Sequence, residues 1–152
     1  MIEGTRVSVV IPAYREARRL PSVLATIPAE VDRVLVVDDA SDDETFALAR
    51  SSADPRVLTL RHARNRGVGA AIATGYARAL ELGGDPRDAF VVMAGDGQMD
   101  PCDLPALVLP IARDEADYVK GDRFAHPESS AIPLARRVGG AAMSALTRAA
   151  IG

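Results

Sequence analysis

Several residue types that mark specialised proteins are scarce in this sequence. It has no tryptophan, a single cysteine, Cys102, and only 4% aromatic residues. One cysteine excludes a disulfide framework and any metal site built from several cysteines. No stretch approaches the roughly 20 apolar residues of a membrane-spanning helix, and the first residues show no signal segment. We therefore expect a cytoplasmic protein, for which peripheral contact with a membrane surface stays open.

An excess of positive charge is also absent, because the formal net charge is -3. A nucleic acid is therefore not an expected partner. The rest of the composition, with 48% hydrophobic and 26% charged residues, is typical of a soluble α/β protein. A chain of 152 residues predicts a single domain over 1–152, whose oligomeric state the composition leaves open.

Short β-branched runs alternate with segments of helical periodicity along the chain. Ser41 followed by Glu44 has the spacing of a capping box and predicts a helix start. Gly75 and the alanines around it predict close packing of a helix against the sheet. Strands are predicted over 6–11, 33–37, 56–60, 90–94 and 117–120, and helices over about 20–27, 41–52, 67–82, 103–114 and 133–150.

Apolar strands separated by helices predict a mostly parallel central sheet with helices on both faces. Such sheets bind ligands beyond the carboxyl ends of their strands. Acidic residues follow two of the predicted strands there, as Asp38-Asp39 and as Asp96 between two glycines. Oxygen ligands from Asp96 and Gln98, completed by a diphosphate and water, suit Mg²⁺ or Mn²⁺.

Five segments, in order along nearly the whole chain, resemble glycosyltransferase family 2, and within it the dolichol-phosphate mannose synthase-like branch. They are V-V-I-P-A-Y-R-E at 9–16, V-V-D-D-A-S-D-D at 36–43, R-N-R-G-V-G-A-A at 64–71, D-G-Q-M-D-P at 96–101 and K-G-D-R-F at 120–124. The resemblance implies a nucleotide-diphospho-sugar transferase (GT-A, Rossmann-like) fold. It also implies transfer of a sugar from a GDP- or UDP-sugar to an acceptor, expected to be a polyprenyl or dolichyl phosphate.

The resemblance also implies roles for individual residues. Asp38 would meet the base, and Asp39 the ribose or the metal region. Asp96 and Gln98 would hold Mg²⁺ or Mn²⁺ on the diphosphate. The nucleoside pocket would further involve Pro12, Tyr14 and Glu16, and the acceptor phosphate would be bound by Arg123 together with Arg136 or Arg137; Asp96 and Arg123 are the expected catalytic residues.

Two departures from the family pattern keep a second function open. Ala94 stands where the metal motif usually has its first aspartate, and the chain ends at Gly152, before a further segment that family members usually have. We therefore expect a C-terminally short domain, and a non-catalytic nucleotide-sugar-binding domain or truncated homologue stays an alternative. The two histidines are expected to be structural (His62) and exposed (His126).

A receiver-like signalling domain is a further alternative, since such domains hold Mg²⁺ with strand-end acids and a lysine. Asp38, Asp39, Asp96 and Lys120 would supply that set. The acidic pair follows the second predicted strand, however, whereas a receiver-like domain has it after the first. This reading also leaves the P-A-Y-R-E and D-G-Q-M-D-P segments without a role.

Overall fold

The computed structural model describes residues 1–83, 85 and 87–121. Contacts divide the chain into two units, Met1–Val119 and Lys120–Gly152. Of the second unit only Lys120 and Gly121 are described, and they lie outside helices and strands. The single domain expected over 1–152 stays a prediction, and the predicted helix 133–150 lies outside the described residues.

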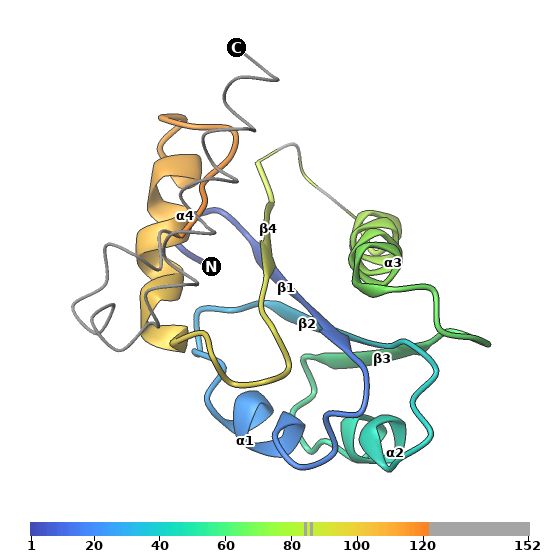
Figure 1. The fold of residues 1–152 in the computed structure, drawn as a ribbon. Coiled ribbons are helices and arrows are strands. Elements are labelled where there is room, and N and C mark those ends of the chain that lie inside the picture. Colours follow the sequence, from blue (N-terminus) through green and yellow to red (C-terminus); the bar gives the residue numbers. More distant parts are fainter. Residues whose placement is uncertain (84, 86, 122–152) are drawn as a thin grey trace, which may run out of the picture. The chain divides into compact units, whose positions relative to one another are not determined.

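A parallel four-stranded sheet with the order β3-β2-β1-β4 forms the first unit (Figure 1). Each connection between successive strands contains a helix, as parallel pairing requires. The strands are β1 (Val7–Ala13), β2 (Arg33–Asp38), β3 (Val57–Arg61) and β4 (Ala89–Val92), and the helices are α1 (Leu20–Ala25), α2 (Thr45–Arg50), α3 (Val68–Glu81), the 3-10 turn η1 (Pro101–Asp103) and α4 (Leu104–Ala112).

Helices cover both faces of this sheet, as predicted from the sequence. Alternate residues of β1 point to opposite faces. Val9 and Ile11 belong to a core shared with α1 and α4, while Val10 belongs to a second core shared with α3. The inner strands β1 and β2 are almost wholly buried, which explains their continuous apolar sequence.

Helix α3 rests closely on β1 because Gly75 has no side chain. A Cβ atom at this position would lie 2.3 Å from Cγ1 of Val10. The close packing predicted for Gly75 is therefore confirmed. At the far end of α3, the guanidinium of Arg33 donates to the carbonyls of Ala79, Leu82 and Gly83, which complements the negative end of the helix.

Two local predictions are wrong. Ser41 does not cap a helix, because α2 begins at Thr45 and the Ser41 hydroxyl instead accepts a hydrogen bond from the backbone of Arg15. Residues 117–120, predicted as a strand, form none, because they pair with no described strand. Within the described part of the chain, no helix is long and apolar enough to cross a membrane.

Candidate functional site

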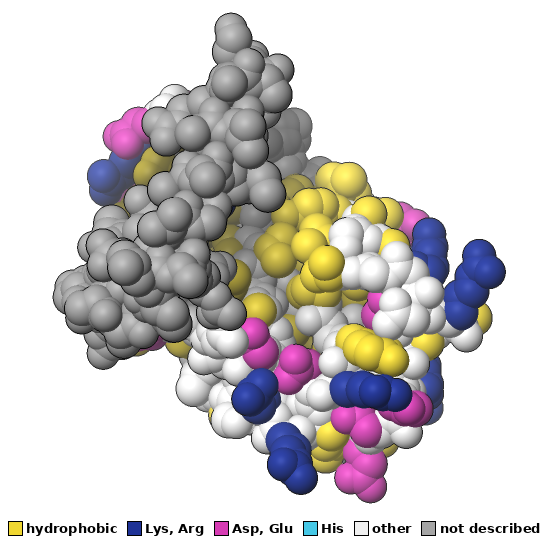
Figure 2. Space-filling model, viewed as in Figure 1, with side chains coloured by type: hydrophobic (Ala, Val, Ile, Leu, Met, Phe, Trp, Pro, Cys, Tyr) yellow, Lys and Arg dark blue, Asp and Glu magenta, His cyan; other side chains and the backbone are white. Residues whose placement is uncertain are grey.

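The carboxyl ends of the strands meet at one edge of the sheet, where the sequence predicted the site. Ala13, Asp38 and Arg61 are partners in register across β1, β2 and β3. The segment after β4 joins this edge, since the backbone N–H of Met93 donates to the carbonyl of Val10. In the view of Figure 2, acidic and basic side chains lie close together on the surface near α1 and α2.

The turn after β1 is held by the turn after β2. Backbone N–H groups of Arg15 and Glu16 donate to the hydroxyls of Ser41 (3.0 Å) and Thr45 (2.9 Å). The Arg15 guanidinium also forms two hydrogen bonds with Asp42, of 2.7 and 2.6 Å. Arg15 has a φ of 57°, a left-handed conformation that costs energy in a residue other than glycine. The bonds from the second turn compensate for this strain and fix the turn that bears Tyr14 and Glu16.

Asp38 lies wholly buried at the end of β2. Its Oδ1 accepts a hydrogen bond from the backbone N–H of Ser41, at 3.2 Å. Its Oδ2 lies 3.1 Å from Nε of Arg61 but accepts no hydrogen bond within the described part of the chain. A buried carboxylate oxygen without a donor is uncommon in folded proteins. The guanidinium of Arg61 also lies 4.9 Å from the ring centre of Phe46, so an arginine flanks this oxygen.

Asp39 is buried beside Asp38, but both of its oxygens are occupied. Oδ1 lies 2.6 Å from Nδ1 of His62 and accepts from the backbone N–H of Arg66, and Oδ2 accepts from the backbone N–H of Gly67. Burial by itself would raise the pKa of Asp39, but these hydrogen bonds outweigh it and hold the pKa below its usual range. Asp39 is therefore an ionised group inside the protein, and it connects β2 to the turn before α3.

The other residues predicted for the nucleoside pocket lie beside the segment after β4. A Cβ atom at Gly95 would lie 3.5 Å from Cγ of Glu16 and 3.6 Å from the carbonyl oxygen of Pro12, so the two segments are in close contact. Tyr14 is 42% exposed, and the Arg15 guanidinium lies 5.3 Å from the centre of its ring. These residues therefore meet Asp38 at the same edge.

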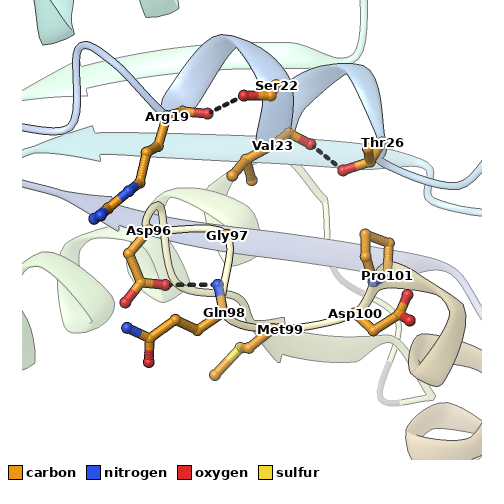
Figure 3. Close-up of a pocket in the computed structure, with 10 residues that line it drawn as sticks. All are labelled: Arg19, Ser22, Val23, Thr26, Asp96, Gly97, Gln98, Met99, Asp100 and Pro101. Carbon is orange, nitrogen blue, oxygen red and sulfur yellow. Dashed lines mark hydrogen bonds between the residues drawn. The ribbon is translucent and has the colours of Figure 1, made fainter.

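Asp96 and Gln98 lie on a tight turn that lines an open cavity of about 480 Å³ (Figure 3). One oxygen of Asp96 accepts from the backbone N–H of Gln98, at 3.0 Å, and the Ala94 N–H donates to the sulfur of Met99. Arg19, from the turn before α1, lines the opposite side of this cavity and extends toward the turn.

The donor atoms of this turn are of the kind that Mg²⁺ and Mn²⁺ prefer. Asp96 and Gln98 offer a carboxylate and a carboxamide oxygen. The described residues contain no group of three or more His, Cys, Asp or Glu side chains that could hold a metal ion. A divalent ion held by Asp96 and Gln98 would need further ligands, such as diphosphate oxygens and water. The expected acceptor residues Arg123, Arg136 and Arg137 lie outside the described residues.

Comparison with known proteins agrees with this arrangement. The family described as "Glycosyl transferase family 2" matches residues 8–136 of the chain. The chain belongs to glycosyl transferase family 2. The resemblance seen in the five sequence segments is thereby confirmed, and the receiver-like alternative is excluded.

Relatives within family 2 include enzymes named for lipid-phosphate acceptors. A UDP-N-acetylglucosamine–dolichyl-phosphate N-acetylglucosaminyltransferase of Methanococcus voltae is 31% identical over 91% of this chain and 60% of its own length. An undecaprenyl-phosphate mannosyltransferase of Micrococcus luteus is 38% identical over 78% of this chain and 48% of its own length. The chain thus spans about half to three-fifths of these relatives.

The fold is that of the GT-A glycosyltransferases of family 2. A crystal structure of glucosyl-3-phosphoglycerate synthase from Mycobacterium tuberculosis, in complex with Mn²⁺, uridine diphosphate and glucosyl-3-phosphoglycerate, has a TM-score of 0.55. It shares 26% identity with the chain and covers 72% of it, while the chain covers 40% of that protein. The predicted fold class is therefore confirmed.

The hydrogen bonds that connect the site residues could not be predicted from the sequence. The prediction that His62 is structural is confirmed by its burial and its two hydrogen bonds, but its bond to Asp39 was not predicted. The support that Ser41 and Thr45 give to the turn after β1 was not predicted either. For Asp39 and His62 the available signal was their position directly after β2 and β3, because such residues share one edge of a parallel sheet.

Proposed function

We propose that this chain transfers a sugar from a GDP- or UDP-sugar to a polyprenyl or dolichyl phosphate, with the help of Mg²⁺ or Mn²⁺. The observation that carries the proposal is the meeting of two segments at one edge of the sheet. One segment contains Asp38, whose buried Oδ2 lies beside Arg61 and accepts no hydrogen bond from the described residues, and the other contains Asp96 and Gln98 beside a cavity. Membership of family 2 and the names of the relatives supply the reaction class.

The nucleoside is assigned to the end of the edge near Asp38. Its carboxylate is the proposed acceptor for an N–H group of a base, because its Oδ2, buried beside Arg61, accepts no hydrogen bond from the described residues; a uracil or a guanine has such a donor. Pro12, Tyr14 and Glu16 complete this end: Tyr14 offers a ring surface, and Glu16 carboxylate oxygens that suit ribose hydroxyls. Asp39, adjacent to Asp38, is assigned to the part of this nucleoside pocket that lies toward the ribose.

The diphosphate is assigned to the turn that carries Asp96 and Gln98. These two residues would hold the divalent ion, which supplies positive charge to stabilise the negative charge that develops on the leaving nucleoside diphosphate. Asp96 holds the turn in shape through its bond to the Gln98 backbone. Since Asp96 and Gln98 are the two side chains assigned to the ion, its remaining ligands would come largely from the diphosphate and water.

The acceptor phosphate is assigned to Arg123, with Arg136 or Arg137, because a guanidinium suits the oxygens of a phosphate. The oxygen of a lipid phosphate is already negatively charged near neutral pH. It therefore needs orientation and desolvation more than it needs a strong general base. A lipid acceptor also places the chain at a membrane surface during the reaction.

Calorimetric titration of the full chain with UDP and with GDP, with and without Mn²⁺, tests the donor site. Asp96→Asn should weaken Mn²⁺-dependent binding by about tenfold or more, since it removes an ionic ligand worth at least about 1.4 kcal/mol. Asp103→Asn is the matched control, because it removes the same charge from an exposed residue of η1 that does not line the cavity. Equal affinities of the wild type and Asp96→Asn would reject the metal role, and failure of the wild type to bind either nucleotide would reject the proposed function.

A second candidate function is nucleotide-sugar binding without transfer. It is favoured by Ala94, which brings a backbone N–H and a methyl group, and no carboxylate, to the first position of the metal motif. Incubation with nucleotide sugars, Mn²⁺ and a polyprenyl phosphate separates the two functions. Donor binding without release of the nucleoside diphosphate in this mixture would favour the binding domain over the transferase.

A further inference from the structure

Three hydrogen-bonded polar groups, two buried and one half-buried, lie behind the carboxyl edge of the sheet. The His62 ring lies between two side chains, with Nδ1 at 2.6 Å from Oδ1 of Asp39 and Nε2 at 2.9 Å from Oγ1 of Thr74. His62 and Asp39 are 8% and 3% exposed, so neither group is solvated as it would be on the surface. Asp39 follows β2, His62 follows β3 and Thr74 lies within α3. Their hydrogen bonds therefore connect these three elements.

The hydrogen-bond chemistry fixes the orientation of the ring. An ionised carboxylate only accepts hydrogen bonds, and the hydrogen bonds that hold the pKa of Asp39 low keep it ionised. Nδ1 of His62 must therefore carry a proton and donate it to Asp39. In a neutral ring Nε2 then accepts from the Thr74 hydroxyl, so each polar atom of the ring has a partner.

The other side of Asp39 holds the turn before α3. The backbone N–H of Arg66 lies 2.9 and 3.1 Å from its two oxygens, and the N–H of Gly67 lies 2.7 Å from Oδ2. Gly67 has a φ of 86°, which glycine adopts at little cost, and this conformation leads the chain from the turn into α3. A carboxylate at this point also complements the positive end of a 14-residue helix.

The turn held in this way is part of the candidate site. Residues 64–67 follow β3, whose last residue, Arg61, is the register partner of Asp38, and the backbone N–H of His62 donates to the carbonyl of Asp38. Arg64 and Arg66 are exposed on this turn and bring two positive charges to the edge where a nucleoside diphosphate would bind.

We propose that His62 is a positioning residue of the nucleotide-sugar site: it holds Asp39, and through Asp39 it sets the place of residues 64–67. Asp39 then acts mainly through the backbone of this turn, and the direct contact with the base falls to Asp38. The inference rests on the proposed function for the ligand. The structural support itself is independent of that function.

Three variants of the full chain test the proposal. His62→Leu removes the donor to Asp39 and leaves a buried carboxylate one hydrogen bond short. His62→Asn is the conservative variant, because an asparagine amide can place an N–H near the position of Nδ1. Arg56→Met is the stability control: the Arg56 guanidinium bonds to the carbonyls of Pro28 and Val31 at the amino edge of the sheet, so its loss weakens the fold away from the site.

The first measurement is hydrogen exchange at the amides of Arg66 and Gly67, which needs no ligand. His62→Leu should speed this exchange by at least about tenfold relative to the exchange of the amides within α3, a factor that corresponds to about 1.4 kcal/mol. His62→Asn should restore much of the protection. Arg56→Met should change the exchange of all amides alike. Unchanged exchange at these two amides in His62→Leu, or an equal effect of Arg56→Met, would overturn the proposal.

The second measurement is calorimetric affinity for UDP and GDP with Mn²⁺. His62→Leu should bind about tenfold more weakly, His62→Asn should recover, and Arg56→Met should bind as the wild type does at a temperature where all variants are folded. If the wild type binds a nucleotide and His62→Leu binds it equally well, the positioning role is overturned while the proposed function stands. No binding by the wild type overturns the proposed function and the role of His62 in it, whereas amide exchange still reports on the support of the turn.

Discussion

Gly75 offers a sharp test of the packing that brings α3 to the candidate site, because two effects of opposite sign compete there. Replacing glycine by alanine inside a helix usually stabilises it by about 1 kcal/mol. At Gly75, however, the added Cβ would lie 2.3 Å from Cγ1 and 3.0 Å from Cγ2 of Val10. Val10 is fully buried in a strand that is paired on both sides, so it has little room to move.

Overpacking of a core by one methyl group costs about 1–3 kcal/mol, and a contact as short as 2.3 Å belongs at the upper end of this range. After subtraction of the helix-propensity gain, Gly75→Ala should destabilise the protein by about 2 kcal/mol. Urea unfolding of the full chain, followed by circular dichroism, measures this change as a lower midpoint with an unchanged slope.

Gly69→Ala is the matched control, because Gly69 lies in the same helix and a Cβ there would meet nothing within 4 Å. This variant should be as stable as the wild type or slightly more stable. The double variant Val10→Ala/Gly75→Ala should be more stable than the sum of the two single effects predicts, by about 1–2 kcal/mol. A Gly75→Ala protein at least as stable as the wild type, or additive effects in the double variant, would refute the close packing of α3 on β1.

Two further predictions concern charge. Because hydrogen bonds lower the pKa of Asp39 in the folded state, its contribution to stability is present above the unfolded pKa, about 3.9, and is lost as the pH falls through the folded value. Urea unfolding at pH 7 and near pH 3 should therefore show a smaller acid loss for Asp39→Asn than for the wild type, and equal losses would contradict the assignment. For the acceptor, Arg123→Ala should raise the apparent KM for a polyprenyl phosphate at least about tenfold, the loss expected for a charged hydrogen bond, and leave UDP or GDP affinity near that of the wild type. Equal losses on both sides would remove Arg123 from the acceptor site.

Much of the fold could be predicted because the responsible signals are local. The buried strands β1 and β2 are largely continuous apolar runs, and the helices that connect the strands of the sheet show helical periodicity or, like α3, glycine at their ends. Their alternation predicts a parallel sheet, and a parallel sheet collects the residues after its strands at one edge. The positions of Asp38, Asp39 and Asp96 at that edge followed from this reasoning.

Local signals failed where a residue has a partner far away in the sequence. Ser41 and Glu44 have the spacing of a capping box, but the Ser41 hydroxyl is used by the Arg15 backbone, 26 residues away. The helix therefore begins at Thr45. Residues 117–120 have a suitable sequence for a strand, but a strand exists only where a neighbouring strand accepts its hydrogen bonds.

The sequence alone determined the family, the order of strands and helices from β1 to α4, and the edge of the sheet at which the acidic residues gather. These properties follow from apolar periodicity and from short motifs, which a linear chain displays directly. Only the tertiary structure distinguished the two adjacent aspartates. Among the residues that the structure describes, no donor bonds to one buried oxygen of Asp38, whereas Asp39 is bonded to His62, Arg66 and Gly67. This difference depends on partners 23 to 28 residues away in the sequence. Folding brings these partners together, and a local sequence pattern does not predict them.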